Sequence, residues 1–230
     1  MLRIQSQRIV RFLSVATVVI TLLGLLRNIF EYVLDFEYGY NLLEIFNLNE
    51  EKNVPAIYSS LILLFSGVIL YAISLHKKSP KDKYYRHWLC LSIIFFYLAL
   101  DEAVSIHENL EAQFLLDKDH ILYDDSWVIV LSVLVAIFVL SYSKFLQHLP
   151  RVSRKMFVLS GFIYIFGCMG MEVVGSFTQE FYGKASMVHA MATTIEEFLE
   201  MSGIVLFIHS LLSYLASLTS ESSQENLRSN

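Results

Sequence analysis

Six long apolar stretches constrain what this chain can fold into. They cover residues 9–34, 56–76, 86–107, 126–147, 155–180 and 187–217. At about 1.5 Å of rise per residue, a helix over any of these stretches can cross the ~30 Å hydrocarbon core of a bilayer. Because a helix satisfies its own backbone hydrogen bonds in lipid, we predict an all-α, polytopic membrane bundle of six transmembrane helices.

The composition agrees with a single membrane domain. Of the 230 residues, 55% are hydrophobic and only three are prolines, and no linker divides the chain. We therefore expect one domain over residues 1–217, followed by a disordered cytoplasmic tail over 218–230 that is short and polar. The expected partner is the lipid bilayer, and no nucleic-acid partner is expected.

Basic residues indicate how the bundle is oriented. They gather at the N-terminus and in two alternate loops, at Arg3, Arg8, Arg11, Lys77, Lys78, Lys81, Lys83, Arg86, Lys144, Arg151, Arg154 and Lys155. The loops over 36–55 and 109–125 are acidic instead. By the positive-inside rule, both termini are predicted to be cytoplasmic and the acidic loops external. In a bacterium, this would be the plasma (inner) membrane.

Acidic side chains inside these apolar stretches are costly, at about 2.5–3.5 kcal/mol each even on an insertion scale. Eight of them lie within a stretch or at its rim: Glu31, Asp101, Glu102, Glu108, Glu172, Glu196, Glu197 and Glu200. With the predicted orientation, all eight fall in the outer part of the membrane. We therefore predict an outward-facing carboxylate site shared by the first, third, fifth and sixth spans.

Helical spacing groups these residues into faces. At about 100° per residue, neighbours three, four and seven positions apart share one side of a helix. Four polar faces result. They are formed by Thr17, Thr21, Asn28, Glu31 and Asp35 on the first span, by Asp101, Ser105 and Glu108 on the third, by Cys168, Glu172, Gly175, Ser176 and Gln179 on the fifth, and by His189, Thr193, Glu196 and Glu200 on the sixth. These faces are expected to surround a polar cavity.

Other features of the spans have simpler expected roles. Arg27 lies four residues before Glu31, which predicts an ion pair on the first span. The spans over 56–76 and 126–147 carry no charge in their apolar runs and are expected to face lipid. In the fifth span, Gly161, Cys168 and Gly175 recur every seven residues and favour close approach of a neighbouring helix.

A plainer interpretation treats these acids as helix ends that reach the outer water. It accounts well for Glu31 and Glu108. It accounts less well for Glu172, Glu197 and Glu200, because long apolar runs follow close by. One cation, Arg27, cannot neutralise so many carboxylates, so the remainder must hold protons, bind metal or share a water-filled vestibule.

A divalent metal site is one hypothesis, because carboxylates with histidine suit Zn, Mn or Fe ions. The candidate ligands are His189, Glu196, Glu200, Asp101, Glu108 and Glu172. In a metal-dependent membrane enzyme, the ion would activate water beside a lipid or small polar substrate. The candidate catalytic residues would then be Asp101, Glu102 and Glu172. The Glu-x-x-His pair that is usual in di-metal helical bundles is absent.

Other functions are also compatible with these residues. A proton- or cation-coupled transporter would also place carboxylates in a membrane cavity, although the cytoplasmic halves of the helices are apolar. A b-type haem protein would use His107 with His189, or His87 with His209, and would leave the acids unexplained. A structural or assembly protein is a further alternative.

Two segments carry a resemblance. The strings LALDEAVSIHENLE at 98–111 and TIEEFLEMSG at 194–203 resemble motifs of uncharacterised bacterial, particularly cyanobacterial, multi-pass membrane proteins. The shared patterns are LDExxxxHE and EExxEM. The resemblance covers the third and sixth spans and implies a membrane protein without implying an activity.

Overall fold

The computed structural model describes residues 2–50, 52–78, 82–106, 121 and 126–229. Its helices are α1 (Leu2–Tyr32), α2 (Glu37–Leu42), α3 (Val54–His76), α4 (Tyr85–Val104), α5 (Trp127–His148), α6 (Arg151–Ile165), α7 (Glu172–Tyr182) and α8 (Met187–Ser229). A short 3₁₀ turn, η1 (Glu44–Phe46), follows α2, and a π-helical segment, η4 (Phe166–Met171), joins α6 to α7.

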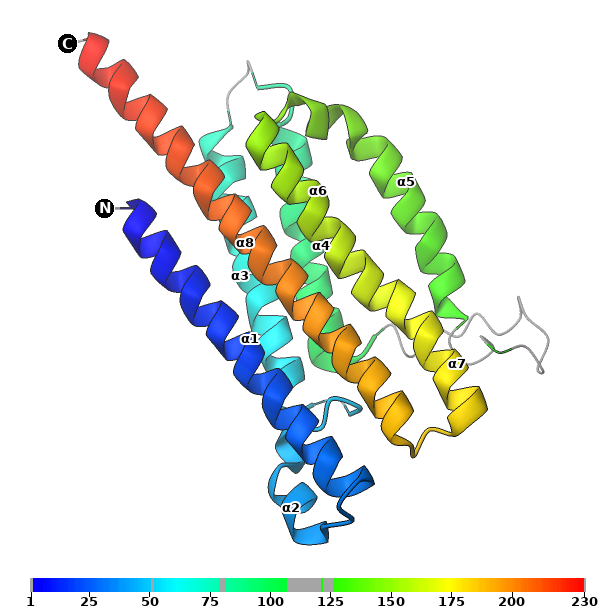
Figure 1. Cartoon of the computed structure of the whole chain (residues 1–230). Helices are drawn as coiled ribbons and strands as arrows, with labels where there is room; N and C mark the ends of the chain where they lie inside the picture. The colour runs from blue at the N-terminus through cyan, green and yellow to red at the C-terminus, as the bar shows by residue number, and fades with distance from the viewer. Residues whose placement is uncertain (1, 51, 79–81, 107–120, 122–125, 230) are drawn as a thin grey trace.

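Six helices in the described part of the chain are long and apolar enough to cross a membrane. They are α1, α3, α4, α5, the continuous α6–η4–α7 rod, and α8. This confirms the predicted all-helical bundle with six spans. Both chain ends lie at the same end of the bundle, and α2 lies at the other (Figure 1).

Several helix boundaries differ from the sequence prediction, and two of them change a predicted feature. The third span was expected to run to residue 107, but α4 ends at Val104 because Ser105 adopts a left-handed conformation with φ of 56°. The Ser105 N–H donates to the Asp101 carbonyl at 2.6 Å, which closes the helix end. At the C-terminus, where a disordered tail was expected from residue 218, α8 continues as a helix to Ser229.

The second span, α3, was expected to face lipid, but one of its faces is part of the core. Leu61, Val68 and Leu75 on its other face are exposed. The helix packs against α4, α1 and α8. Its side chains Ile62, Leu63, Leu70 and Ile73 are almost completely buried. They share a core with Trp88, Leu91, Met201, Ile208 and Leu211 from α4 and α8. Lack of charge therefore predicted a spanning helix but not its position.

Small residues allow α3 and α4 to approach closely. A Cβ added at Gly67 would lie 2.8 Å from the Phe96 ring, so only glycine fits there without displacing that ring. The hydroxyl of Ser92 donates to the Gly67 carbonyl at 2.9 Å, and that of Ser60 donates to the Ala99 carbonyl at 2.7 Å. Such interhelical hydrogen bonds and small-residue contacts are how helices associate where lipid removes the hydrophobic driving force.

The α6–η4–α7 rod packs against α8 through other glycines than those predicted. A Cβ at Gly203 would meet the Tyr164 backbone at 2.8 Å, and one at Gly167 would meet Glu200 at 2.9 Å. Gly161, by contrast, has nothing within 4 Å of such a Cβ, and Gly175 has only His189 at 3.9 Å. The predicted seven-residue stripe therefore borders open space rather than a tightly packed neighbour.

The fourth span, α5, is buried at both of its ends, and aromatic contacts hold its C-terminal end. Its Phe145 ring lies 4.9 Å from Trp88 and stacks on His87 with centroids 5.5 Å apart. The Tyr142 hydroxyl donates to the His87 carbonyl at 3.1 Å. Along the middle of α5, side chains such as Leu134 and Leu140 are exposed. This loosely packed stretch borders the cavity described next.

Candidate functional site

A cavity of about 1500 Å³ lies between α4, α5, the α6–η4–α7 rod and α8. The fourth span was expected to face lipid, yet α5 lines this cavity from Trp127 to Leu146. The first span was expected to contribute, yet no α1 residue belongs to the lining. Thr17 of α1 instead hydrogen-bonds Tyr58 of α3, and Asn28 donates to Thr194 of α8. The polar face of α1 thus serves helix packing.

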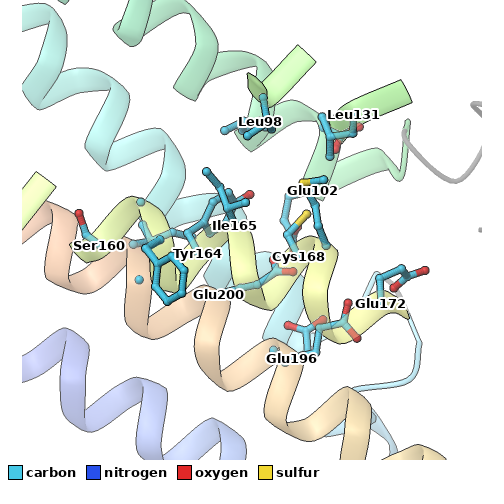
Figure 2. A pocket seen from close by; sticks show the side chains of 18 of the residues that line it. Leu98, Glu102, Leu131, Ser160, Tyr164, Ile165, Cys168, Glu172, Glu196 and Glu200 are labelled. Atoms are coloured by element: carbon cyan, nitrogen blue, oxygen red, sulfur yellow. The ribbon is translucent and has the colours of Figure 1, made fainter. Parts of the chain in front are cut away.

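Acidic side chains dominate the polar part of the lining. They are Glu50, Asp101, Glu102, Glu172, Glu196, Glu197 and Glu200. Among the described residues, the basic side chains in this lining are Lys184 and His189. Figure 2 shows Glu102, Glu172, Glu196 and Glu200 gathered around the same space, from α4, α7 and α8.

Helix α8 contributes a polar stripe to the cavity. His189, Thr193, Glu196 and Glu200 all line it, as their helical spacing predicts. Thr194 and Met201, which lie on the other side of α8, are buried in the protein. One face of α8 therefore lines the cavity, and the other packs into the core.

Glu172 begins α7 directly after the π-helical segment η4. Such segments are rare and often occur at functional sites, because the extra residue per turn changes where nearby side chains point. Within η4, Gly167 lies against the Glu200 backbone nitrogen, where a Cβ would come within 3.1 Å. This close approach brings Cys168 and Glu172 beside the glutamates of α8, as Figure 2 shows.

On α4, Asp101 and Glu102 occupy the last turn, and both line the cavity. The predicted stripe of Asp101, Ser105 and Glu108 assumed that the helix continues. Because α4 ends at Val104, that spacing no longer applies beyond Ser105. Glu108 and His107, the other candidates on this segment, lie outside the described residues.

The carboxyl groups lie close enough to interact. The Glu196 carboxyl is within hydrogen-bonding reach of Glu172. Glu200 experiences the charges of Glu197, Glu102, Glu172 and Asp101. Since an ionised carboxylate can only accept hydrogen bonds, a hydrogen bond between two carboxyl groups requires a proton on one of them.

His189 is the candidate metal ligand other than a carboxylate that the structure describes. Its Nδ1 lies 3.2 Å from the Thr178 hydroxyl of α7, so one ring nitrogen already has a partner. Within the described ranges, no group of three histidine, cysteine, aspartate or glutamate side chains is arranged to hold a metal ion. The candidate ligands His189, Glu196, Glu200, Asp101 and Glu172 nevertheless all line the one cavity.

The other end of the cavity is apolar and aromatic. Its lining there comes from Phe138, Tyr142, Phe145, Phe157 and Phe207. We call these five residues the aromatic end, and we call Glu102, Glu172, Glu196, Glu197 and Glu200 the carboxylate end. The cavity is therefore strongly amphipathic along its length.

Arg27 lies away from the cavity in a network of its own. The predicted pair with Glu31 is confirmed. Arg27 has a second partner that helical spacing did not predict, Glu44, whose carboxylate lies 2.9 Å from the Arg27 guanidinium because η1 folds back along α1. The Leu48 side chain packs directly against Gly24 of α1. This contact holds the folded-back segment against the helix. The apolar run 42–46 within an acidic loop was the available signal that this segment folds onto the bundle.

A family model described as Domain of unknown function (DUF8692) matches residues 10–215. This range contains every residue that lines the cavity. No curated protein and no solved structure matches the chain. The comparisons thus assign a family without an activity.

Proposed function

We propose that this chain, which belongs to the family described as Domain of unknown function (DUF8692), is an integral membrane protein that binds protons at an intramembrane carboxylate cluster. The cluster is the carboxylate end of the cavity. With the orientation that the basic loops predict, it faces the outer side of the membrane.

The observation that carries this proposal is the gathering of Glu172, Glu196 and Glu200 around one cavity whose remaining lining is largely apolar. The carboxyl groups of Glu172 and Glu196 are within hydrogen-bonding reach, and two ionised carboxylates at that separation would repel each other. A proton shared between them removes the repulsion and supplies the missing hydrogen-bond donor. Glu200, Glu102 and Asp101 add further negative charge to the same space.

The scarcity of positive charge near the carboxyl groups also favours bound protons. Arg27 of α1 is buried and forms ion pairs with Glu31 and Glu44. Lys184, which lines the cavity, is exposed on the turn between α7 and α8. Within the described lining, the acidic side chains outnumber Lys184 and His189 several-fold. Bound protons or another cation would neutralise the excess.

A divalent metal is the second candidate occupant. It is favoured by the convergence of His189 with Glu196, Glu200, Asp101 and Glu172 on one cavity, a donor set that suits Zn, Mn or Fe. A metal there would support the enzyme hypothesis, with Asp101, Glu102 or Glu172 as the base. Metal analysis of purified protein tests this: stoichiometric metal that is lost in Glu196→Gln/Glu200→Gln supports it, and metal-free wild type contradicts it.

The aromatic end of the cavity favours binding or catalysis over transport. Its lining consists of Phe138, Tyr142, Phe145, Phe157 and Phe207, which offer no charged step for an ion among the described residues. A carrier needs a path to both sides of the membrane. Among the described residues, the cavity carries charged side chains at one end only.

Infrared spectroscopy of the protein in lipid nanodiscs tests proton binding. Wild type should show a protonated-carboxyl absorption that persists at neutral pH, and Glu196→Gln should lose a large part of it. The matched control is Glu180→Gln, because Glu180 is exposed on α7 and outside the lining. Wild type without this absorption at neutral pH would contradict the proposal.

A further inference from the structure

The cavity has the dimensions of a lipid-like molecule. Its volume of about 1500 Å³ exceeds the ~300–1,000 Å³ typical of small-molecule pockets. From Glu196 at the carboxylate end to Phe207 at the aromatic end, α8 rises by about 16 Å at 1.5 Å per residue. This is roughly half of the ~30 Å hydrocarbon core, the depth of one acyl chain in one leaflet.

The apolar part of the cavity is open at its side. Leu134 of α5 and Val158 and Phe162 of α6 all line it, yet their exposed fractions are 56%, 53% and 65%. Side chains that line a cavity and remain this exposed border an opening rather than a closed wall. In a membrane, an opening between α5 and α6 faces lipid, which provides a lateral route for a chain-bearing molecule.

The lining also favours one type of head group. The acidic side chains at the carboxylate end complement a cation that donates several hydrogen bonds, which an ammonium group does. A phosphate or carboxylate head would meet like charges from Glu102, Glu172, Glu196 and Glu200. A neutral alcohol would supply no positive charge to the carboxyl groups that stay ionised beside the shared proton.

From this shape and charge complementarity, we propose that the cavity binds a single-chain amphiphile with a protonated amine head. The ammonium group lies among Glu172, Glu196 and Glu200, and the hydrocarbon chain lies between α5 and α6 towards Phe157 and Phe207. The inference rests on the proposed function, because it uses the same carboxyl groups, and it adds the class of ligand that enters their cavity.

Gly161 allows the chain-binding part to be tested separately from the carboxyl groups. A Cβ at this position meets nothing within 4 Å, and Gly161 lines the cavity on α6. Replacing it with phenylalanine therefore fills space that the chain would occupy, without a clash in the protein itself. Since glycine disfavours a helix interior, Gly161→Phe should fold at least as well as wild type.

The experiment measures binding of hexadecylamine, hexadecanol and hexadecyl phosphate to purified protein by native mass spectrometry. Wild type should retain one hexadecylamine and bind the alcohol and the phosphate at least about tenfold more weakly. Gly161→Phe and Glu196→Gln/Glu200→Gln should each weaken amine binding about tenfold. The control Leu159→Phe, exposed on the same helix but outside the lining, should bind as wild type does.

The proposed position of the chain would be overturned if Gly161→Phe and Leu159→Phe bind the amine equally well. The proposed head group would be overturned if hexadecanol or hexadecyl phosphate binds as tightly as the amine. Failure of the underlying function looks different. In that case wild type lacks the protonated-carboxyl absorption while still retaining the amine. If the absorption is present but no amine binds, only the ligand proposal fails.

Discussion

Helices α3 and α5 are similarly apolar, yet they differ in how far they pack into the protein. In the most apolar stretch of α3, 44% of the residues are buried, whereas the corresponding share for α5 is 11%. Ser66 and Gly67 give α3 a surface that α4 approaches closely, with Ser92 bonded across the contact. On α5, the Ser141 hydroxyl donates to the Phe138 carbonyl of its own helix and the residue remains exposed. Apolar composition thus selects spanning helices, and the placement of small polar residues selects which of them pack.

The difference divides the molecule into two sides. On the packed side, α1, α3, α4 and one face of α8 supply most of the core, which also takes in Phe145 of α5 and Phe157 of α6. On the cavity side, α5, the α6–η4–α7 rod, the other face of α8 and the last turns of α4 enclose the space with the carboxyl groups. Paired substitutions of the same chemistry on the two sides should separate structural positions from functional ones.

The largest contrast is expected for one leucine on each side. Leu70→Ala on α3 removes a side chain with 0% exposure and should cost about 2–4 kcal/mol in unfolding free energy through the cavity it leaves. Leu140 on α5 is 75% exposed, so Leu140→Ala should change that free energy by less than about 0.5 kcal/mol. Reversible denaturation in a mild detergent measures both. Equal losses would mean that α5 is packed as firmly as α3.

Charge substitutions should show the next largest contrast. Arg27 is 4% exposed and paired with Glu31 and Glu44. Arg27→Ala leaves those carboxylates without their cation and should cost about 2–3 kcal/mol. Glu196→Gln keeps the shape of the side chain and removes a crowded carboxyl, so stability should not fall. The same denaturation assay compares them, and a larger loss for Glu196→Gln would assign Glu196 a structural role.

Two glycines should respond with opposite signs. Gly203→Ala pushes a methyl group into the Tyr164 backbone, 2.8 Å away, and should destabilise the fold by about 1–3 kcal/mol. Gly161→Ala enters open space and should stabilise the helix by about 0.5–1 kcal/mol. Thermal unfolding in detergent gives the sign directly. Destabilisation by Gly161→Ala would show that the cavity is closed there.

The smallest contrast concerns single hydroxyl groups. Ser92→Ala removes the interhelical bond to the Gly67 carbonyl and should cost about 0.6 kcal/mol, the average for such bonds in a membrane protein. Ser141→Ala removes a bond within α5 at an exposed position and should have no measurable effect on unfolding free energy. If both variants unfold like wild type, the hydroxyl contributes nothing to α3–α4 association.

The sequence predicted the spans and much of the cavity for simple physical reasons. Apolar runs long enough for a bilayer define helices almost alone, and the spacing of His189, Glu196 and Glu200 fixes their common face once the helix is regular. Asp101 and Glu172 could be added because the basic loops orient each helix. Local periodicity and topology were sufficient for these residues.

Other features depend on contacts that a local pattern does not contain. Glu44 reaches Arg27 only because the chain reverses after α2, and the left-handed Ser105 ends α4 earlier than its composition suggests. The two uncharged helices are α3 and α5. That α3 is the one that packs into the core depends on the close contact between Gly67 of α3 and Phe96 of α4. The Arg27–Glu31 pair was predictable because it lies within one helix turn.

The central claim is that Glu172 and Glu196 share a proton inside the cavity. The most direct test is a cycle of Glu172→Gln, Glu196→Gln and the double variant, each examined in nanodiscs by the protonated-carboxyl infrared absorption at neutral pH. A shared proton predicts that each single variant loses about as much absorption as the double variant, because either change breaks the pair. Losses that simply add, or single variants that leave the absorption unchanged, would contradict the account.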